Sequence, residues 1–190
     1  QIAYFPGELG NYCLLLLDTK VEHALANTAY NDRRASCERV LANVQAIYPE
    51  VATLREVNAE RLSQLPDISP EDKARAGFVI AENERVRQTT TALQKGHLER
   101  VGQLLYASHE GLSKIYEVSC RELDLLVDLS RAESTILGAR MMGGGFGGCT
   151  INLIQSNTAV AVAENILAAY EKATGITGVA HVVNIGEGVS

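Results

Sequence analysis

The first feature of this sequence with possible chemistry is a dense glycine cluster at residues 143–148, which reads G-G-G-F-G-G. Such a run is costly to order, because glycine loses more backbone freedom on folding than any other residue. It is expected only where the backbone takes positive φ, or where it lies so close to another group that no Cβ fits. The cluster therefore marks either a tight turn without a ligand or a surface that meets one.

Two phosphate-binding motifs can be compared with this cluster. Gly143, Gly145 and Gly148 satisfy G-x-G-x-x-G, the dinucleotide fingerprint, whose last glycine opens a helix that receives a pyrophosphate. Here the following residues, 149–154, are β-rich and alternate in polarity, which predicts a strand and excludes that fingerprint. No Gly-Lys-Ser or Gly-Lys-Thr follows, so a P-loop is excluded too. The cluster is predicted to be a hinge between strands at 138–142 and 149–154.

The other side chains with metal or redox chemistry are scattered. The cysteines at positions 13, 37, 120 and 149 form no C-x-x-C pair, and the four histidines show no metal-ligand spacing. We therefore expect reduced thiols in a cytosolic protein and no structural zinc.

Composition narrows the possible classes of partner. The 190 residues are 46% hydrophobic and carry a net charge of −6, which allows one substantial core and disfavours nucleic-acid binding. The apolar run Cys13–Leu17 is far too short to span a bilayer, so no membrane partner is expected. The chain starts at Gln1 without a signal-peptide pattern, and we expect a fragment of a longer protein.

The elements around the glycine cluster begin with a buried strand at 13–18 and a long helix at 22–47. Residues 50–132 are predicted to be helical, with a loop at 66–70 in which Ser69 caps a helix that begins at Pro70. A core-facing stripe on that helix is predicted at Phe78, Ile80, Ala81, Val86 and Leu93.

The C-terminal third reads strand, hinge, strand, helix, strand. Ser156 and Asn157 are a plausible cap for the helix, Gly175 ends it, and residues 179–185 form the last strand. This order predicts an α+β fold with helices packed on one face of a mostly antiparallel sheet.

Three segments resemble galactokinases, members of the GHMP small-molecule kinase superfamily, and they occur in the family's order. They are G-A-R-M-M-G-G-G-F-G-G-C-T-I-N-L (138–153), S-H-E-G-L-S-K-I-Y-E-V-S-C-R-E-L-D-L-L-V (108–127) and V-E-H-A-L-A-N-T-A-Y-N-D-R-R (21–34). The resemblance implies a GHMP-kinase C-terminal domain at residues 21–190, with residues 1–20 as the end of an upstream lobe or a linking strand.

The chain departs from the family pattern at several positions. Phe78 stands where galactokinases often have histidine, and Gly111 replaces the usual serine. Lys114 and Arg121 also differ. We therefore interpret Phe78 as a packing residue.

The resemblance also implies site residues. Tyr30 matches the tyrosine that galactokinases present to the sugar, although by itself it reads as a partly buried helix residue. His23 belongs to the same signature, with binding and core packing both open, and Arg33 and Arg34 are expected to pair with nearby acids. Ser108 and His109 either approach the cleft or form buried hydrogen bonds. The glycine motif that shapes the cleft is Gly143, Gly144, Gly145, Phe146, Gly147 and Gly148.

The activity implied by the resemblance is transfer of the γ-phosphoryl group of ATP to the anomeric hydroxyl of D-galactose. The phosphate loop, the catalytic aspartate and the main sugar-binding motif of the family lie upstream of this chain, and Asp18 is not assigned as the base. We expect ATP and Mg²⁺ to be bound mainly by that upstream lobe, and this chain alone to be inactive.

Other functions remain open. A galactokinase-like sensor of sugar and ATP, acting through a protein partner, shares these motifs, and so does a kinase for N-acetylgalactosamine. Homoserine and mevalonate kinases share the glycine hinge only loosely and lack Y-E-V-S-C-x-E-L-D. A domain that only binds a partner lobe is the plainest alternative.

Overall fold

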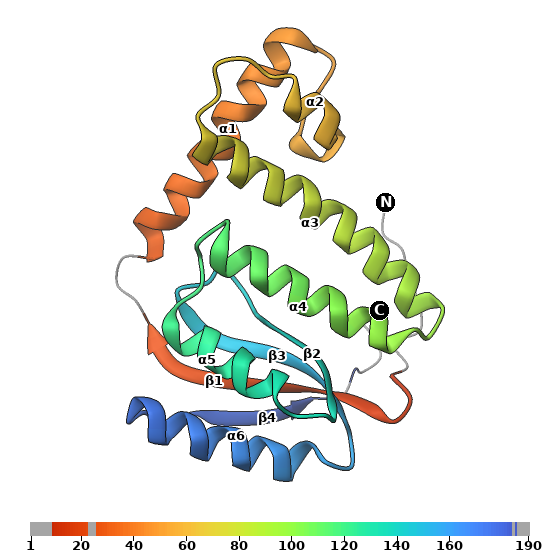
Figure 1. Ribbon diagram of the computed structural model, residues 1–190, viewed down its shortest axis with the longest axis vertical. Helices are drawn as coiled ribbons and strands as arrows, with labels where there is room; N and C mark the ends of the chain where they lie inside the picture. The colour runs from red at the N-terminus through yellow and green to blue at the C-terminus, as the bar shows by residue number, and fades with distance from the viewer. Residues whose placement is uncertain (1–8, 23–25, 184, 186–190) are drawn as a thin grey trace, which may run out of the picture.

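The computed structural model describes residues 9–22, 26–183 and 185. It contains a four-stranded sheet with helices packed against it and a further group of helices above it (Figure 1). The strands are β1 (Tyr12–Glu22), β2 (Ile136–Met141), β3 (Gly147–Gln155) and β4 (Val179–Val183). The helices are α1 (Ala26–Ile47), the 3-10 helix η1 (Leu54–Glu56), α2 (Ala59–Ser63), α3 (Pro70–Gln94), α4 (Leu98–Lys114), α5 (Arg121–Arg131) and α6 (Ala159–Thr174).

The sheet has the order β2-β3-β1-β4, and each neighbouring pair is antiparallel. The apolar run of β1 suits an inner strand: Leu15 and Leu17 are fully buried on one face, while Leu14 and Leu16 are half-buried on the other. The strand predicted at 13–18 and the two strands around the glycine hinge are thus confirmed. The proposed domain boundary after residue 20 falls inside β1, which continues to Glu22.

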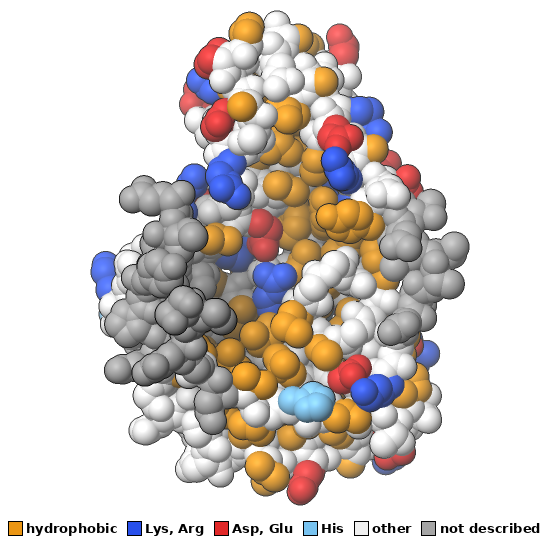
Figure 2. Space-filling model, turned by 180° about the vertical axis from the view of Figure 1, so that it is seen from behind, with side chains coloured by type: hydrophobic (Ala, Val, Ile, Leu, Met, Phe, Trp, Pro, Cys, Tyr) orange, Lys and Arg blue, Asp and Glu red, His pale blue; other side chains and the backbone are white. Residues whose placement is uncertain are grey.

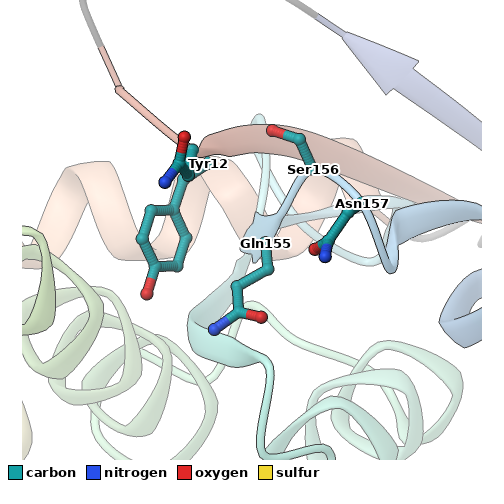
Figure 3. Close-up of a pocket in the computed structure, with 5 residues that line it drawn as sticks. Tyr12, Gln155, Ser156 and Asn157 are labelled. Atoms are coloured by element: carbon teal, nitrogen blue, oxygen red, sulfur yellow. The ribbon is translucent and has the colours of Figure 1, made fainter.

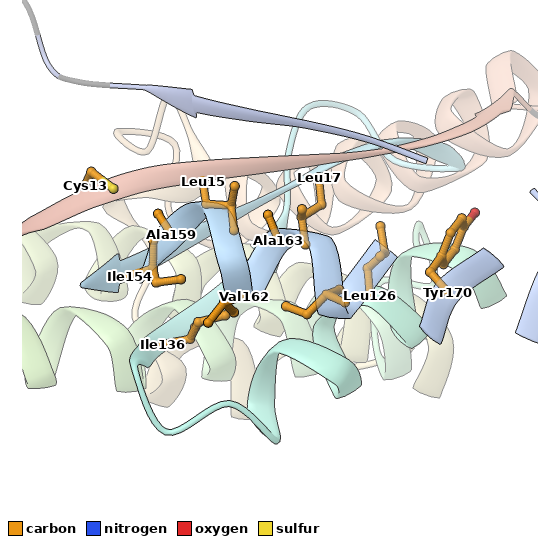
Figure 4. Close-up of a cluster of buried hydrophobic side chains, with 11 residues drawn as sticks. Cys13, Leu15, Leu17, Leu126, Ile136, Ile154, Ala159, Val162, Ala163 and Tyr170 are labelled. Carbon is orange, nitrogen blue, oxygen red and sulfur yellow. The ribbon is translucent and has the colours of Figure 1, made fainter. Parts of the chain in front are cut away.

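Helices α5 and α6 cover the face of the sheet on which Leu15 and Leu17 lie (Figure 4). Each fully buried leucine contributes about 1.5–3 kcal/mol relative to an exposed one. Tyr170 of α6 is fully buried as well, and its hydroxyl donates a hydrogen bond of 2.9 Å to the carbonyl oxygen of Thr19. The α+β arrangement predicted from the sequence is confirmed.

Helix α4 lies against β2 in direct backbone contact. A Cβ atom built on Gly102 would lie 2.1 Å from the carbonyl oxygen of Leu137, and one built on Gly138 would lie 2.1 Å from the carbonyl oxygen of Gly102. No other residue type leaves room for this approach. The two glycines therefore set the distance between α4 and the sheet.

A second hydrophobic core joins α1, η1, α2 and the first half of α3 at the top of Figure 1. Between α1 and α3, Arg39 donates to Asp72 through Nε at 2.9 Å, and the buried Arg75 donates to Ser36 at 3.0 Å. The buried residues of this core are Val40, Val44, Val51, Leu54, Val57, Leu62, Leu65 and Ala76.

The predicted start of α3 is confirmed, because the Ser69 hydroxyl accepts a hydrogen bond from the Asp72 N–H at 3.1 Å and Pro70 is the first helical residue. The start of α6 is later than predicted. It begins at Ala159, because residues 156–158 form a turn in which the N–H of Thr158 donates to the carbonyl oxygen of Gln155 at 3.1 Å.

The predicted stripe on α3 is wrong for Ala81 and Val86, which are exposed. Here α3 turns polar residues inward instead: Glu82 accepts a hydrogen bond of 2.7 Å from Ser108 on α4.

Across the residues that the structure describes, no helix has the length and apolar character needed to cross a membrane.

Candidate functional site

The glycine cluster forms the turn between β2 and β3. The N–H of Met142 donates to the carbonyl oxygen of Cys149 at 2.9 Å, and the turn begins beyond this pair. Five of the residues 143–148 have positive φ, from 59° at Phe146 to 129° at Gly147, and only Gly144 does not. Because side chains disfavour positive φ, these angles explain why the turn is built from glycine.

The turn is docked on the loop at residues 115–120, which joins α4 to α5 and is called the α4–α5 loop below. A Cβ atom on Gly145 would lie 2.0 Å from the carbonyl oxygen of Val118. The N–H of Phe146 donates to the same oxygen at 2.7 Å, and the Phe146 side chain packs against a neighbouring hydrophobic cluster. Gly145 is therefore required both by its φ and by this close approach.

The other side of the turn meets the end of β1. The Thr19 hydroxyl donates to the carbonyl oxygen of Gly148 at 2.7 Å, and Glu22 pairs with Gly147 after a bulge in β1.

Partial burial raises the pKa of Asp18, but hydrogen bonds and charge from Lys20 outweigh it and lower the pKa overall. A general base needs the opposite shift, toward neutral pH, so Asp18 is unsuited to that role.

The α4–α5 loop also anchors the helix that carries Tyr30. Arg33 of α1 donates through Nε to the carbonyl oxygen of Tyr116 and through Nη2 to that of Glu117, both at 3.0 Å. Tyr30 itself is 51% exposed. Burial raises the pKa of Tyr116, and the nearby Cys37 and Tyr30 add to the shift. One short loop thus fixes both the glycine turn and the helix of Tyr30.

The residues of the Tyr30 signature divide into three groups. The predicted pairing of both arginines with acids is confirmed, since Arg33 lies 3.3 Å from Glu117 and Arg34 lies 2.8 Å from Glu38. His23 lies outside the described residues. Sugar contact by Tyr30 stays a prediction.

Ser108 and His109 form separate buried hydrogen bonds, so the second of the two expectations for them is correct. Ser108 bonds to Glu82, whereas His109 accepts a hydrogen bond from the Met141 N–H at 3.2 Å. The Nε2 atom of His109 lies 3.2 Å from Oδ1 of Asp124. Sequence reasoning missed Asp124 as a partner, although it lies in the matched segment 108–127.

The face of the sheet opposite α5 and α6 is only partly covered. Leu14, Leu16 and Ile151 are half-buried there, and His181 is exposed. The molecule seen from behind shows hydrophobic side chains down its middle and charged side chains in a hollow near the centre (Figure 2).

A charged cluster lies beside this face, in a hollow of about 180 Å³. Glu82 contacts Arg85 directly and lies 3.9 Å from Nη1 of Arg140 on β2. Burial lowers the pKa of both arginines. One carboxylate therefore lies between two guanidinium groups.

A larger cavity, of about 490 Å³, lies at the far end of the sheet and is lined by Tyr12, Gln155, Ser156 and Asn157 together with Asn11 (Figure 3). Tyr12 pairs with Gln155 at one end of β1, whereas Glu22 pairs with Gly147 at the other. This cavity is therefore remote from the glycine turn and from Tyr30.

The described residues offer limited support for binding Mg²⁺ or ATP. Within 9–22, 26–183 and 185, no group of three or more His, Cys, Asp or Glu side chains could hold a metal ion. The glycine turn leads into a strand and not into a helix N-terminus, so it lacks the usual cradle for a nucleotide phosphate. The described residues therefore show no such metal cluster, and the glycine turn shows no such phosphate cradle.

Comparison with known proteins agrees with the architecture. A family model described as the C-terminal domain of GHMP kinases matches residues 89–172. A galactokinase of Thermotoga maritima is 41% identical over 189 residues, which are 100% of this chain and 52% of that protein. The chain thus spans about half the length of the curated relatives that it matches.

Solved structures give the same result. The crystal structure of Lactococcus lactis galactokinase complexed with galactose matches with a TM-score of 0.87 and 32% identity, covering 96% of this chain and 47% of that one. L. major mevalonate kinase in complex with R-mevalonate matches less well, with a TM-score of 0.55 and 25% identity over 89% of this chain and 42% of that one. Across its whole length the chain is similar to the C-terminal portion of galactokinases, and its residues 89–172 match the C-terminal domain of GHMP kinases.

Proposed function

We propose that the full-length protein containing this chain is a galactokinase, which transfers the γ-phosphoryl group of ATP to the anomeric hydroxyl of D-galactose and forms galactose 1-phosphate. The observation that carries the proposal is the match of 100% of this chain to galactokinases at 41% identity. This chain alone is proposed to be inactive.

Tyr30 is proposed to contact the sugar. Its phenol can hydrogen-bond a sugar hydroxyl while the ring packs against the pyranose. Its exposure of 51% supports this role, because a phenol buried in the core is not available to a ligand. His23, seven residues earlier, is proposed as a second sugar-binding residue on the strength of the family signature alone.

The glycine turn is proposed to form a wall of the cleft without side chains. Positions 143 and 144 support this role, since a Cβ atom on either glycine would have no other atom within 4 Å. A ligand or another lobe can therefore approach the backbone there. Val118 holds the turn at Phe146, whose N–H donates to its carbonyl oxygen at 2.7 Å.

The catalytic groups themselves are proposed to lie in the upstream half of the protein. Phosphoryl transfer requires a phosphate cradle, bound Mg²⁺ and a group that orients or deprotonates the acceptor hydroxyl. Magnesium would stabilise the charge that develops on the phosphoryl group. The described residues form no cluster of three or more metal-ligating side chains, and the glycine turn leads into a strand, so we assign no step to this chain.

The upstream lobe is proposed as the main partner of this chain. The half-buried row of Leu14, Leu16 and Ile151 supports an interface on the open face of the sheet, since such apolar surface is usually covered.

A cytoplasmic location is also proposed. It is supported by the cysteines Cys13, Cys37, Cys120 and Cys149, which are all free thiols.

The experiment measures galactose-dependent release of ADP by the full-length protein, with this chain alone and the full-length Tyr30→Phe variant as controls. We expect turnover with galactose, little with N-acetylgalactosamine, none from this chain alone, and a raised KM for galactose in Tyr30→Phe. Galactose binding without turnover would favour the sensor, and preferred turnover of N-acetylgalactosamine would favour the second kinase. Galactose phosphorylation by this chain alone would overturn the assignment of the chemistry to the upstream half.

A further inference from the structure

His109 of α4 connects the end of β2 to α5. Its side chain is buried, and Nδ1 accepts the hydrogen bond from the Met141 N–H at 3.2 Å. Because Nδ1 accepts, the proton of the neutral imidazole lies on Nε2 and points to Asp124, 3.2 Å away. Asp124 thereby favours the tautomer of His109 whose Nδ1 can accept the hydrogen bond from the Met141 N–H.

The N–H of Met141 has no other strand to bond to. Successive N–H groups of a strand point to opposite sides, and the next one, on Met142, bonds to Cys149 of β3. Since β2 is an edge strand, the Met141 N–H points outward, toward His109. Loss of the imidazole acceptor would leave this buried donor unpaired.

Asp124 also orders the α4–α5 loop. Its Oδ1 accepts a hydrogen bond from Ser119 at 2.6 Å, and its Oδ2 accepts one from Ser113 at 2.8 Å. Ser119 follows Val118, whose carbonyl oxygen receives the Phe146 N–H at 2.7 Å. Met141, two residues before the glycine turn, and Phe146 inside the turn are thus both connected through short paths to the carboxylate of Asp124.

We propose that His109 and Asp124 are positioning residues that set the conformation of the 143–148 turn and thereby the rate of the reaction. The proposal rests on the proposed galactokinase function for its effect on rate, but not for its effect on the turn. Phe146 supplies the one side chain among residues 143–148, so the shape of this turn depends largely on bonds from outside it. Neither residue is proposed to touch the substrate.

Burial favours the neutral imidazole, since it lowers the pKa of His109. Asp124 and Asp128 of α5 act in the opposite direction, and Arg131 of the same helix adds to the lowering. The neutral form is the one that can accept from the Met141 N–H.

Two substitutions at His109 separate its two bonds. Asparagine places an amide oxygen near the position of Nδ1 and can accept from Met141, but it does not reach Asp124. Glutamine places an amide nitrogen near the position of Nε2 and can donate to Asp124, but it leaves Met141 without its acceptor. Asp124→Asn tests the tautomer, because an amide that donates to Nε2 would move the imidazole proton to Nδ1.

The test uses the full-length protein and measures kcat, KM for galactose, thermal stability, and hydrogen–deuterium exchange of residues 140–150. We expect His109→Gln and Asp124→Asn to lower kcat by about tenfold or more, as small displacements of active-site elements do, and to speed exchange in this segment. His109→Asn should keep its kcat within about threefold of the wild-type value. It should also keep slow exchange in this segment, even if its melting temperature falls as far as that of His109→Gln. In the His109→Asn background, the further effect of Asp124→Asn on exchange should be smaller.

Equal losses in His109→Asn and His109→Gln, or losses that simply follow the melting temperature, would overturn the proposal. So would unchanged exchange at 140–150 in His109→Gln. If the wild-type protein does not phosphorylate galactose, the proposed function fails. The hydrogen–deuterium exchange of residues 140–150 then still decides whether His109 and Asp124 position the turn. The exchange of α6, which should not change, is the internal control.

Discussion

The ring of Phe78 on α3 occupies the space that a side chain at position 111 of α4 would need. A Cβ atom on Gly111 would lie 2.3 Å from Cε2 of Phe78, and the ring also packs on Tyr116 with the centroids 5.2 Å apart. Both positions depart from the galactokinase pattern described above, which often has histidine at the first and usually serine at the second. The contact couples the two positions, because the Phe78 ring leaves no room for a side chain at position 111.

Gly111→Ser is expected to destabilise the protein by about 1–3 kcal/mol, the usual cost of overpacking. The cost should be smaller in a Phe78→His background, where the ring is smaller, and urea denaturation of the two single variants and the double variant measures the difference. Gly77→Ala on α3 is the matched control. Only the flexible Leu62 side chain lies near, at 3.3 Å, so the helix gains up to about 1 kcal/mol in propensity. Equal costs of Gly111→Ser in both backgrounds would contradict the coupling.

Three alanine substitutions within the turn should differ in cost. Gly144→Ala should be tolerated, because this residue has no positive φ and open space around it. Gly143→Ala has space but a φ of 80°, and should cost about 1–2 kcal/mol. Gly145→Ala adds a contact of 2.0 Å with the carbonyl oxygen of Val118 and should cost more. Chemical denaturation checks the order, and three equal costs would show that the turn has relaxed away from the α4–α5 loop.

The elements best predicted from the sequence are those with a strong local cause. Ser69 before Pro70 fixes a helix start through the chain's own hydrogen bond, and Gly175 ends α6 with a φ of 73°. The inward face of α3 was not predictable in this way. Val86 is 64% exposed, although Glu82, one turn earlier on the same side of α3, bonds to Ser108 on α4. Apolar spacing alone does not show which polar residue will find a partner on another helix.

The site shows the same limit. The need for positive φ in the glycine turn follows from its composition, but its docking on Val118 depends on a loop far away in the sequence. The bond between His109 and the Met141 N–H likewise joins residues 32 positions apart. A matched motif can mark such residues as a group, yet only the fold shows which of them bond to one another.

Acid should weaken the contact between α1 and α3. Hydrogen bonds from Arg39 lower the pKa of Asp72 from 3.8 to about 2, against an opposing effect of burial. Between these pH values the unfolded state binds more protons, so the free energy of unfolding falls as the pH falls from about 4 to 2. Above pH 4 this contribution is fully present. Asp72→Asn and Arg39→Gln should both flatten this part of the pH–stability curve, measured by thermal unfolding at fixed ionic strength. A steep fall that persists in both variants would assign the acid sensitivity to other carboxylates.

Two neighbouring arginines on α1 offer a final comparison. The side chain of Arg33 is 13% exposed and donates to the carbonyl oxygens of Tyr116 and Glu117, whereas the 70% exposed Arg34 pairs across the surface with Glu38. Arg33→Lys cannot reproduce the forked geometry and would leave at least one carbonyl oxygen without its donor. If Tyr30 contacts galactose, this loosening of its helix should raise KM for galactose by about tenfold while changing kcat less. Arg34→Lys should leave both constants unchanged, because an exposed ion pair contributes little. Steady-state measurement of kcat and of KM for galactose in the two full-length variants tests this difference. An equal response to both substitutions would mean that the α4–α5 loop does not determine where Tyr30 lies.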